Sequence, residues 1–488
     1  MVSRAARTLL PILLVGLGLL PSAFLTLRAG TTTFEIDATS LRQALVYALS
    51  GATVSVIAGS LCALVIGVHD FWGRRAATLL VAVPIAAPPA FWWLGVSRLP
   101  GVPWASSVGL FRAIFVSGLA LSPIVFLFVL AAIREIPTNA YEAARVSLSP
   151  FARLSWILVP LIRSSVLSGF LLTSILLLAE SEIPFLFGFR TTMTDIITRF
   201  SRTFDASRVA APGVGLLLVV LVLGVLLSRP LLRTLLTLPR GGRGIARTRS
   251  TAAGIFTLGV VGIVLVPLVG YAWTAIGGRG KGSGPSVDTT TMLISICEPA
   301  IAALAALLVG VAVAYPLRRS RTTNLLLVAG LLVFCIPSAM NAIGWIGIGQ
   351  ALGGATVSPV AVQVLRLWGV AAMGFATGYA RLPKSLEDAA RLVAASSLQR
   401  AWTFVLPLLA PSLAATALLA AAIIYSDRDV ASLLLSPGAE RLTLNLYLAS
   451  ANAPAATVGI LGLIVFGGAL ATAFVASAVP FVVLRRRG

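Results

Sequence analysis

Two pairs of carboxylates stand at matching places in the two parts of this chain, and they are the side chains best suited to bind a solute. The pairs are Glu180 with Glu182 and Asp427 with Asp429, and each begins twenty residues after a proline. Carboxylate oxygens favour hard cations such as iron(III) over anions. One interpretation is therefore a route for a cationic or metal substrate.

Two other interpretations of these carboxylates remain open. Both pairs fall inside long apolar runs, where a carboxylate is costly and normally faces a bundle interior or an aqueous cavity. In the structural interpretation, Asp427 or Asp429 pairs with Arg428 or with an arginine on the facing half. In the other, the carboxylates simply lie at the water interface. Glu298 is a further acid in an apolar run, and it receives no role because it has no counterpart.

The chain lacks the residue patterns of an enzyme. It has no G-x-x-x-x-G-K-[ST] phosphate loop, so any ATP hydrolysis would belong to another polypeptide. Its one histidine, His69, lies beside arginines, and its three cysteines have neither metal-ligand nor disulfide spacing. We expect no catalytic residue, no bound metal and no cofactor in this chain.

Composition defines the elements that must hold these side chains. With 58% hydrophobic and 11% charged residues and a mean hydropathy of +0.99, a soluble domain would lack polar surface. A helix needs roughly 20 apolar residues to cross a membrane, and twelve such runs predict an all-α, polytopic membrane protein of about 12 spans. The runs cover residues 8–28, 44–68, 76–98, 108–132, 163–187, 212–234, 252–276, 293–317, 324–350, 361–380, 411–434 and 456–484.

Two of these runs contain residues that interrupt helices. Pro84, Pro88 and Pro89 lie in the third run and Pro337 lies in the ninth, so kinked helices packed inside protein are expected there. The first run has an alternative interpretation as a secretory signal, because arginines precede it and small residues follow. Its length and the spans after it favour a membrane helix.

The net charge of +21 has a membrane explanation. If the N-terminus is inside, most lysines and arginines fall in cytoplasmic segments and most acids do not, which is the positive-inside bias. This distribution predicts a multi-pass protein of a bacterial-type cytoplasmic (inner) membrane with both termini cytoplasmic. Nucleic acid is not an expected partner.

The chain divides into two similar halves. A Gly/Arg-rich run near the middle reads as a cytoplasmic linker at residues 239–251, between a first half at 1–238 and a second at 252–488. Six spans in each half give both the same orientation in the membrane. The halves therefore form a parallel duplication.

Each half carries a charged loop between its fourth and fifth spans, at about 133–162 and 381–410. Two short helices joined by a turn would make each loop a compact knob that can dock into another protein, although a plain solvated connection is the alternative. The repeated residues are Glu142, Ala143, Ala144, Arg145 and Pro160 in the first loop, and Asp388, Ala389, Ala390, Arg391 and Pro407 in the second.

These loops resemble the signature of the permeases of binding-protein-dependent ABC importers, which reads Glu-Ala-Ala, three residues, Gly, nine residues, Ile-x-Leu-Pro. The signature glycine is missing from both copies, with Ala394 in its place in the second and a one-residue deletion in the first. Flanking segments resemble the subgroup whose two permease halves are fused, which includes importers of ferric iron, thiamine, polyamines and aminoethylphosphonate.

The resemblance implies a transport subunit with several partners. The twin loops would seat on an ABC ATPase, expected to be a homodimer that uses the ATP, and an extracytoplasmic solute-binding protein would deliver a small solute, with iron(III) preferred on the carboxylate pairs. The alternative is an ion-coupled secondary transporter that uses its membrane acids. That alternative leaves the twin loops unexplained.

Overall fold

The computed structural model describes most of the chain as helices. The described residues are 4–29, 37–100, 109–136, 138–236, 248–277, 287–318, 322–393, 396–435 and 440–485. Most of the proposed linker, residues 239–247, lies outside them. Two short strands, β1 (His69–Asp70) and β2 (Thr248–Arg249), pair in parallel and join the end of α2 to the segment before α12.

The first half begins with two long helices and a broken one. These are α1 (Arg4–Ala29), α2 (Ala38–Val68), and the sequence α3 (Arg74–Ala82), η1 (Val83–Ala86) and α4 (Pro89–Val96). The remaining elements are α5 (Leu110–Arg134), α6 (Thr138–Ser147), α7 (Pro150–Arg153), the π-helix η3 (Leu154–Leu158), α8 (Val159–Leu178), α9 (Glu182–Leu186), α10 (Thr192–Thr203) and α11 (Ser207–Leu236).

The second half repeats this order. It contains α12 (Thr251–Gly277), α13 (Thr289–Leu317), the broken pair α14 (Thr323–Cys335) and α15 (Ser338–Ala351), α16 (Pro359–Ala380), α17 (Lys384–Val393), α18 (Ser397–Arg400), the π-helix η4 (Ala401–Val405), α19 (Leu406–Ser426), α20 (Arg428–Leu434), α21 (Leu442–Asn452) and α22 (Ala455–Arg485).

Ten described helices are long and apolar enough to cross a membrane, or up to twelve if each bent pair counts as one span. The bent pairs are the third and ninth predicted spans, where the chain turns by 103° between residues 86 and 89 and by 86° between residues 335 and 338. Pro88 and Pro337 precede α4 and α15 directly. The predicted all-α membrane architecture and the breaks at the prolines are confirmed.

The boundaries of the fifth and eleventh spans were wrong. The structure places these spans at residues 151–178 and 397–426, so they start inside the charged loops and end before the carboxylate pairs. Hydropathy alone misplaced them because apolar residues resume after the acids, in the short helices α9 and α20. The acids therefore lie in breaks at the ends of spans rather than within them.

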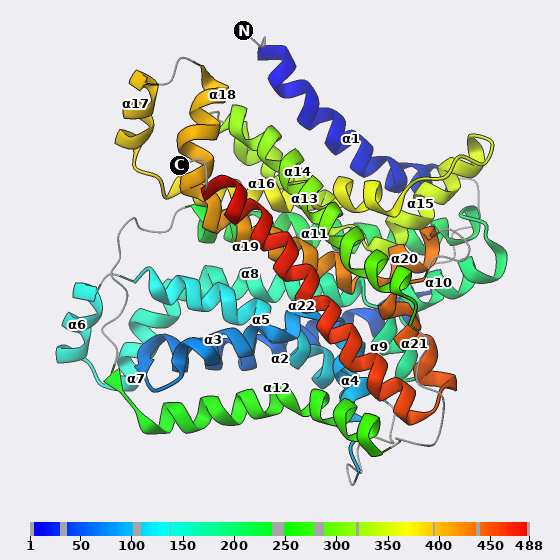
Figure 1. Ribbon diagram of the computed structural model, residues 1–488, viewed down its shortest axis with the longest axis horizontal. Helices are drawn as coiled ribbons and strands as arrows, with labels where there is room; N and C mark the ends of the chain where they lie inside the picture. Colours follow the sequence, from blue (N-terminus) through cyan, green and yellow to red (C-terminus); the bar gives the residue numbers. More distant parts are fainter. Residues whose placement is uncertain are drawn as a thin grey trace.

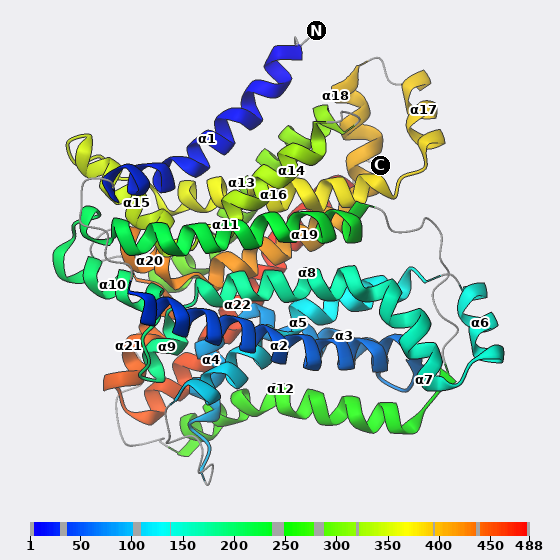
Figure 2. The same cartoon turned by 180° about the vertical axis from the view of Figure 1, so that it is seen from behind.

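Both charged loops lie at the same end of the helical bundle (Figures 1 and 2). Helices α6 and α7 come from the first half, and α17 and α18 come from the second. This end is called the loop end below. The short helices α10, α20 and α21 lie toward the opposite end.

The first helix of each half packs against the other half as well as against the last helix of its own half, α11 or α22. Helix α1 packs against α14 and α15, and α12 packs against α3 and α4. Glycines permit both contacts: a Cβ on Gly95 would meet the backbone of Pro267, and one on Gly344 would meet the backbone of Pro21. These contacts make the two halves one packed unit.

Candidate functional site

Each loop joins its membrane helix through a π-helix. The membrane helix that follows has a proline as its second residue. Pro160 and Pro407 are the second residues of α8 and α19, directly after η3 and η4. A proline ring clashes with the carbonyl four residues back and offers no N–H, and a wider π turn accommodates it. The structure therefore builds the two loops alike, with the second short helix of each running into the membrane span.

The repeated residues of the loops divide into an inner and an outer set. Ala144 and Ala390 are buried against the body of the protein, whereas Glu142, Ala143 and Arg145 are exposed, as are Asp388 and Ala389. The position of the Arg391 side chain lies outside what the structure describes. Tyr141 is also buried, beneath the Arg153 guanidinium at 5.4 Å from the ring centre, and anchors α6.

Large apolar side chains stand exposed at equivalent positions of the two loops. Val146 and Leu392, each four residues after the loop acid, are both 90% exposed. Phe151 and Leu398, in the second short helices, are 78% and 67% exposed. Exposed apolar groups that gather in this way are typical of contacts with another protein or with the membrane. We call these four side chains the loop contact set.

The four carboxylates meet in the interior, between the halves. Each pair begins where a span ends, and its first acid caps a short helix. The Glu180 carboxylate accepts hydrogen bonds from the backbone N–H groups of Glu182 (2.9 Å) and Ile183 (3.3 Å), and the Asp427 carboxylate accepts one from Val430 (3.3 Å). Each first acid thus satisfies backbone N–H groups at the start of the short helix that follows it.

The second acid of each pair binds the opposite half. Arg428, which lies between the two acids of its own half, donates to Glu182 at 2.9 Å. The equivalent residue of the first half, Ser181, donates to Asp429 at 3.3 Å. This reciprocal exchange fastens the two breaks together. Arg428 also lies 3.7 Å from Asp429 and covers the Tyr447 ring at 4.0 Å.

A second buried arginine neutralises Asp427. Arg366 of α16 contacts the Asp427 carboxylate at 2.7 Å, and Gln363 donates to the same oxygen at 3.0 Å. The sequence interpretation did not identify Arg366, although an arginine inside an apolar run itself indicates an intramembrane partner. The first half has Ala120 at the corresponding position, when the loops are aligned on Pro137 and Pro383.

Together these side chains border one cavity of ≈ 150 Å³. All four acids line it, with Arg366 and Arg428, and the broken helices contribute residues from Pro84 to Pro89 and Ser338. Four carboxylates and two guanidinium groups leave an excess of negative charge if all are ionised. Among the described residues, no group of three His, Cys, Asp or Glu side chains could hold a metal ion.

Two further ion pairs join distant parts of the chain outside this cavity. Glu298, unassigned from the sequence, meets Arg441 at 2.6 Å and fixes the start of α21 on α13. Glu135 and Arg381, the residues that end α5 and α16 at equivalent positions, lie 3.7 Å apart at the loop end. This second pair joins the halves next to the two loops.

Such an architecture, with two like-oriented helical halves, paired loops at one end and a charged cavity between the halves, defines a membrane permease. The chain belongs to the family described as binding-protein-dependent transport system inner membrane component, whose model matches residues 40–234 and again residues 306–485. Each match contains one loop and one carboxylate pair, and neither contains helix α1 or α12. Searches of curated proteins and of solved structures found no match.

Proposed function

We propose that this chain is the transmembrane permease subunit of an importer in which a separate ABC ATPase, present as a homodimer, docks on the loop contact set. Equivalent apolar exposure in both loops, with Val146 and Leu392 alike at 90%, is the observation that carries the proposal. A solvated connection would have no need of these side chains. One ATPase subunit seats on each loop.

The remainder of the transport cycle follows from this docking. ATP bound by the ATPase draws its two subunits together and moves the loops, and each loop transmits the motion through its continuous helix to a carboxylate pair. A solute-binding protein delivers the cargo at the end opposite the loops. This orientation places the loops and both termini in the cytoplasm of a cell with an inner membrane, as the positive charge of the chain supports.

The cargo we propose is a small cation, because the cavity between the halves carries more carboxylates than arginines. Iron(III) is the first cation to test, on the affinity of carboxylates for hard cations. An organic cation, such as a polyamine, is the second candidate. One observation favours it: the carboxylates are spread over two breaks, and no described group converges as metal ligands do.

The experiment measures ATPase association and uptake for the double variant Val146→Asp with Leu392→Asp. Since each aspartate would have to be buried in the ATPase contact, we expect association to fall at least tenfold and uptake to stop. The matched control is Trp72→Asp, an equally exposed apolar residue between α2 and α3 outside both loops.

The result that contradicts docking is unchanged association in the double variant. Loss of association in the Trp72→Asp control would place the contact elsewhere on the loop end. An ion-coupled secondary transporter is the outcome if the chain, reconstituted alone, accumulates solute with a proton or sodium gradient and no ATPase.

A further inference from the structure

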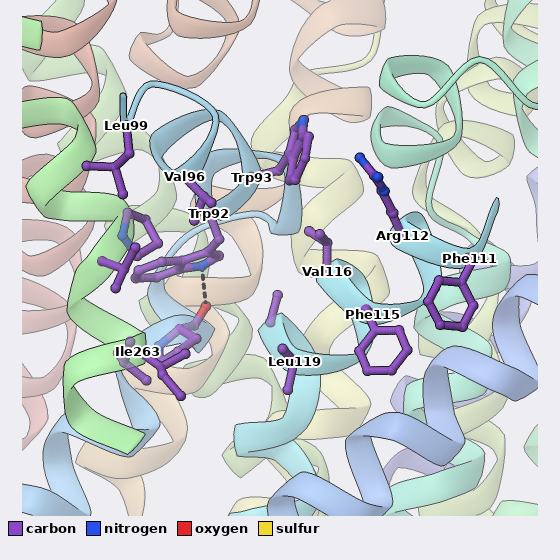
Figure 3. Close-up of a pocket in the computed structure, with 15 residues that line it drawn as sticks. Trp92, Trp93, Val96, Leu99, Phe111, Arg112, Phe115, Val116, Leu119 and Ile263 are labelled. Atoms are coloured by element: carbon purple, nitrogen blue, oxygen red, sulfur yellow. Dashed lines mark hydrogen bonds between the residues drawn. The ribbon is translucent and has the colours of Figure 1, made fainter. Parts of the chain in front are cut away.

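An apolar groove of ≈ 680 Å³ lies on the side of the bundle, between α4 and α5 of the first half and α12 of the second (Figure 3). Trp92, Leu99 and Ile263 stand on one side of it, and Phe111 and Phe115 stand on the other. The volume is in the range of sites that bind a small apolar molecule. The groove meets the charged cavity only at Pro84, which lines both, and the importer proposal does not use the groove.

The groove has the depth of one lipid leaflet. Its wall on α5 runs from Phe111 to Ala120, which at about 1.5 Å per residue is roughly 14 Å, or half of the roughly 30 Å hydrocarbon layer. Helix α5 starts at Leu110, at the end of the bundle opposite the loops. The groove therefore lies in the leaflet opposite the loop end.

Polarity within the groove is confined to its outer end. The indole N–H of Trp92 donates to the backbone carbonyls of Pro84 (3.1 Å) and Ala87 (3.3 Å), so the ring presents an apolar face. Arg112, in the first turn of α5, is the charged side chain of the lining. An arginine at the end of a span reaches the level of the lipid head groups, where it meets phosphate.

The residue of the second half that corresponds to Val116 of the groove is buried by other side chains of that half. Val116 of the groove corresponds to Val362 of α16 when the loops are aligned, and Val362 is fully buried. Ala342 and Val430 pack with it, and Trp345, Leu433 and Leu434 cover the cluster. Ser358 occupies the place of Arg112. The open groove and its arginine at the rim thus distinguish the first half from the second.

We propose that this groove binds one anionic phospholipid of the leaflet opposite the loop end. Its acyl chain lies between α5 and α12 along the apolar wall of the groove, and its head-group phosphate meets Arg112. The lipid would support α12 where that helix crosses from its own half to α4. The location in the membrane and the charge at the rim both fit this occupant.

The test counts bound lipid by native mass spectrometry on the full chain, extracted in mild detergent and incubated with phosphatidylglycerol or phosphatidylcholine. We expect wild-type protein to retain one more phosphatidylglycerol than Leu119→Trp or Val116→Trp, whose rings would occupy the groove. Arg112→Gln should lower the preference for phosphatidylglycerol over phosphatidylcholine about fivefold. Leu258→Trp, on an exposed part of α12 outside the groove, is the matched control.

Three outcomes would overturn the site. Both groove variants could retain as many lipids as wild type, the Leu258→Trp control could lose the same lipid, or the wild-type chain could bind the two lipids equally well. Because a tryptophan in the groove could disturb folding, each variant is first compared with wild type by thermal unfolding. Two groove positions are used so that a folded variant is available for counting.

Discussion

Arg428 is the residue on which the contact between the two breaks depends most. Its side chain is about one-tenth exposed and contacts carboxylates of both halves, Glu182 and Asp429. In an apolar interior an arginine and a carboxylate stabilise one another, and removing one partner leaves a buried charge that costs several kcal/mol. The charge of Asp427 is neutralised by a different residue, Arg366.

Replacing Arg428 with glutamine should therefore destabilise the protein by roughly 3–5 kcal/mol, because Glu182 loses its cationic partner. Thermal unfolding in detergent measures the effect. The control is Arg208→Gln, which breaks the exposed pair with Asp205 and should change stability by at most about 1 kcal/mol. Adding Glu182→Gln to Arg428→Gln should recover part of the loss. An equal effect of the two arginine substitutions would contradict the buried role of Arg428.

At the scale of the elements, two features stand out: helices α1 and α12, which reach across to the other half, and the π-helices η3 and η4 of the two loops. Helix α12 approaches α4 so closely that Gly95 and Gly270 have no room for a side chain between them. Interfaces between membrane helices use small residues in this way because lipid supplies little drive for association and close van der Waals contact must replace it. The contact of Gly344 with Pro21 does the same for α1.

Gly95→Ala should destabilise the chain by about 1–3 kcal/mol, because the added methyl group meets the backbone of Pro267 and the helices must separate. Gly259→Ala on α12 is the matched control, since a Cβ there meets nothing within 4 Å. The control should be neutral or stabilising by up to about 1 kcal/mol, because alanine favours a helix. Thermal unfolding distinguishes the two. Equal stability of both variants would mean that α12 does not rest on α4.

At the scale of the whole molecule, two halves share one interior. The packing of α1 and α12 against the other half, the reciprocal contacts of Ser181 and Arg428, and the Glu135–Arg381 pair near the loops all cross between them. A conformational change that moves the loops must act on contacts that both halves supply. The halves should accordingly assemble through these contacts rather than through the covalent link alone.

Residues 1–238 and 252–488, produced together as separate chains, should therefore co-purify and transport solute at a rate within a few-fold of the intact chain. Affinity capture of one tagged half and uptake assays provide the measurements. The control begins the first chain at residue 37, which removes α1 and should weaken capture, because α1 packs on α14 and α15. Capture that is unaffected by removal of α1 would contradict the packing of α1 against the second half.

Class, span number, helix breaks and the repeated loops followed from the sequence, because each depends on local properties of the chain. Apolar runs, prolines and the Glu142 and Asp388 motifs each involve only a few neighbouring residues. They can therefore be recognised in the sequence without knowledge of the tertiary contacts. The ends of the fifth and eleventh spans were not recognised, because α9 and α20 add further apolar residues after their acids. A hydropathy profile does not separate a span from a short helix that follows it.

The sequence by itself determined that this is a two-half membrane protein with paired loops and paired carboxylates. Only the tertiary structure decided that Glu182 and Asp429 are held by the opposite half, that Arg366 neutralises Asp427, and that α1 and α12 each pack against both halves. The physical reason is that these contacts join residues far apart in the chain, and a buried charge gains its stability from whichever partner the packing brings to it. Local composition specifies the helices, and their packing specifies the site.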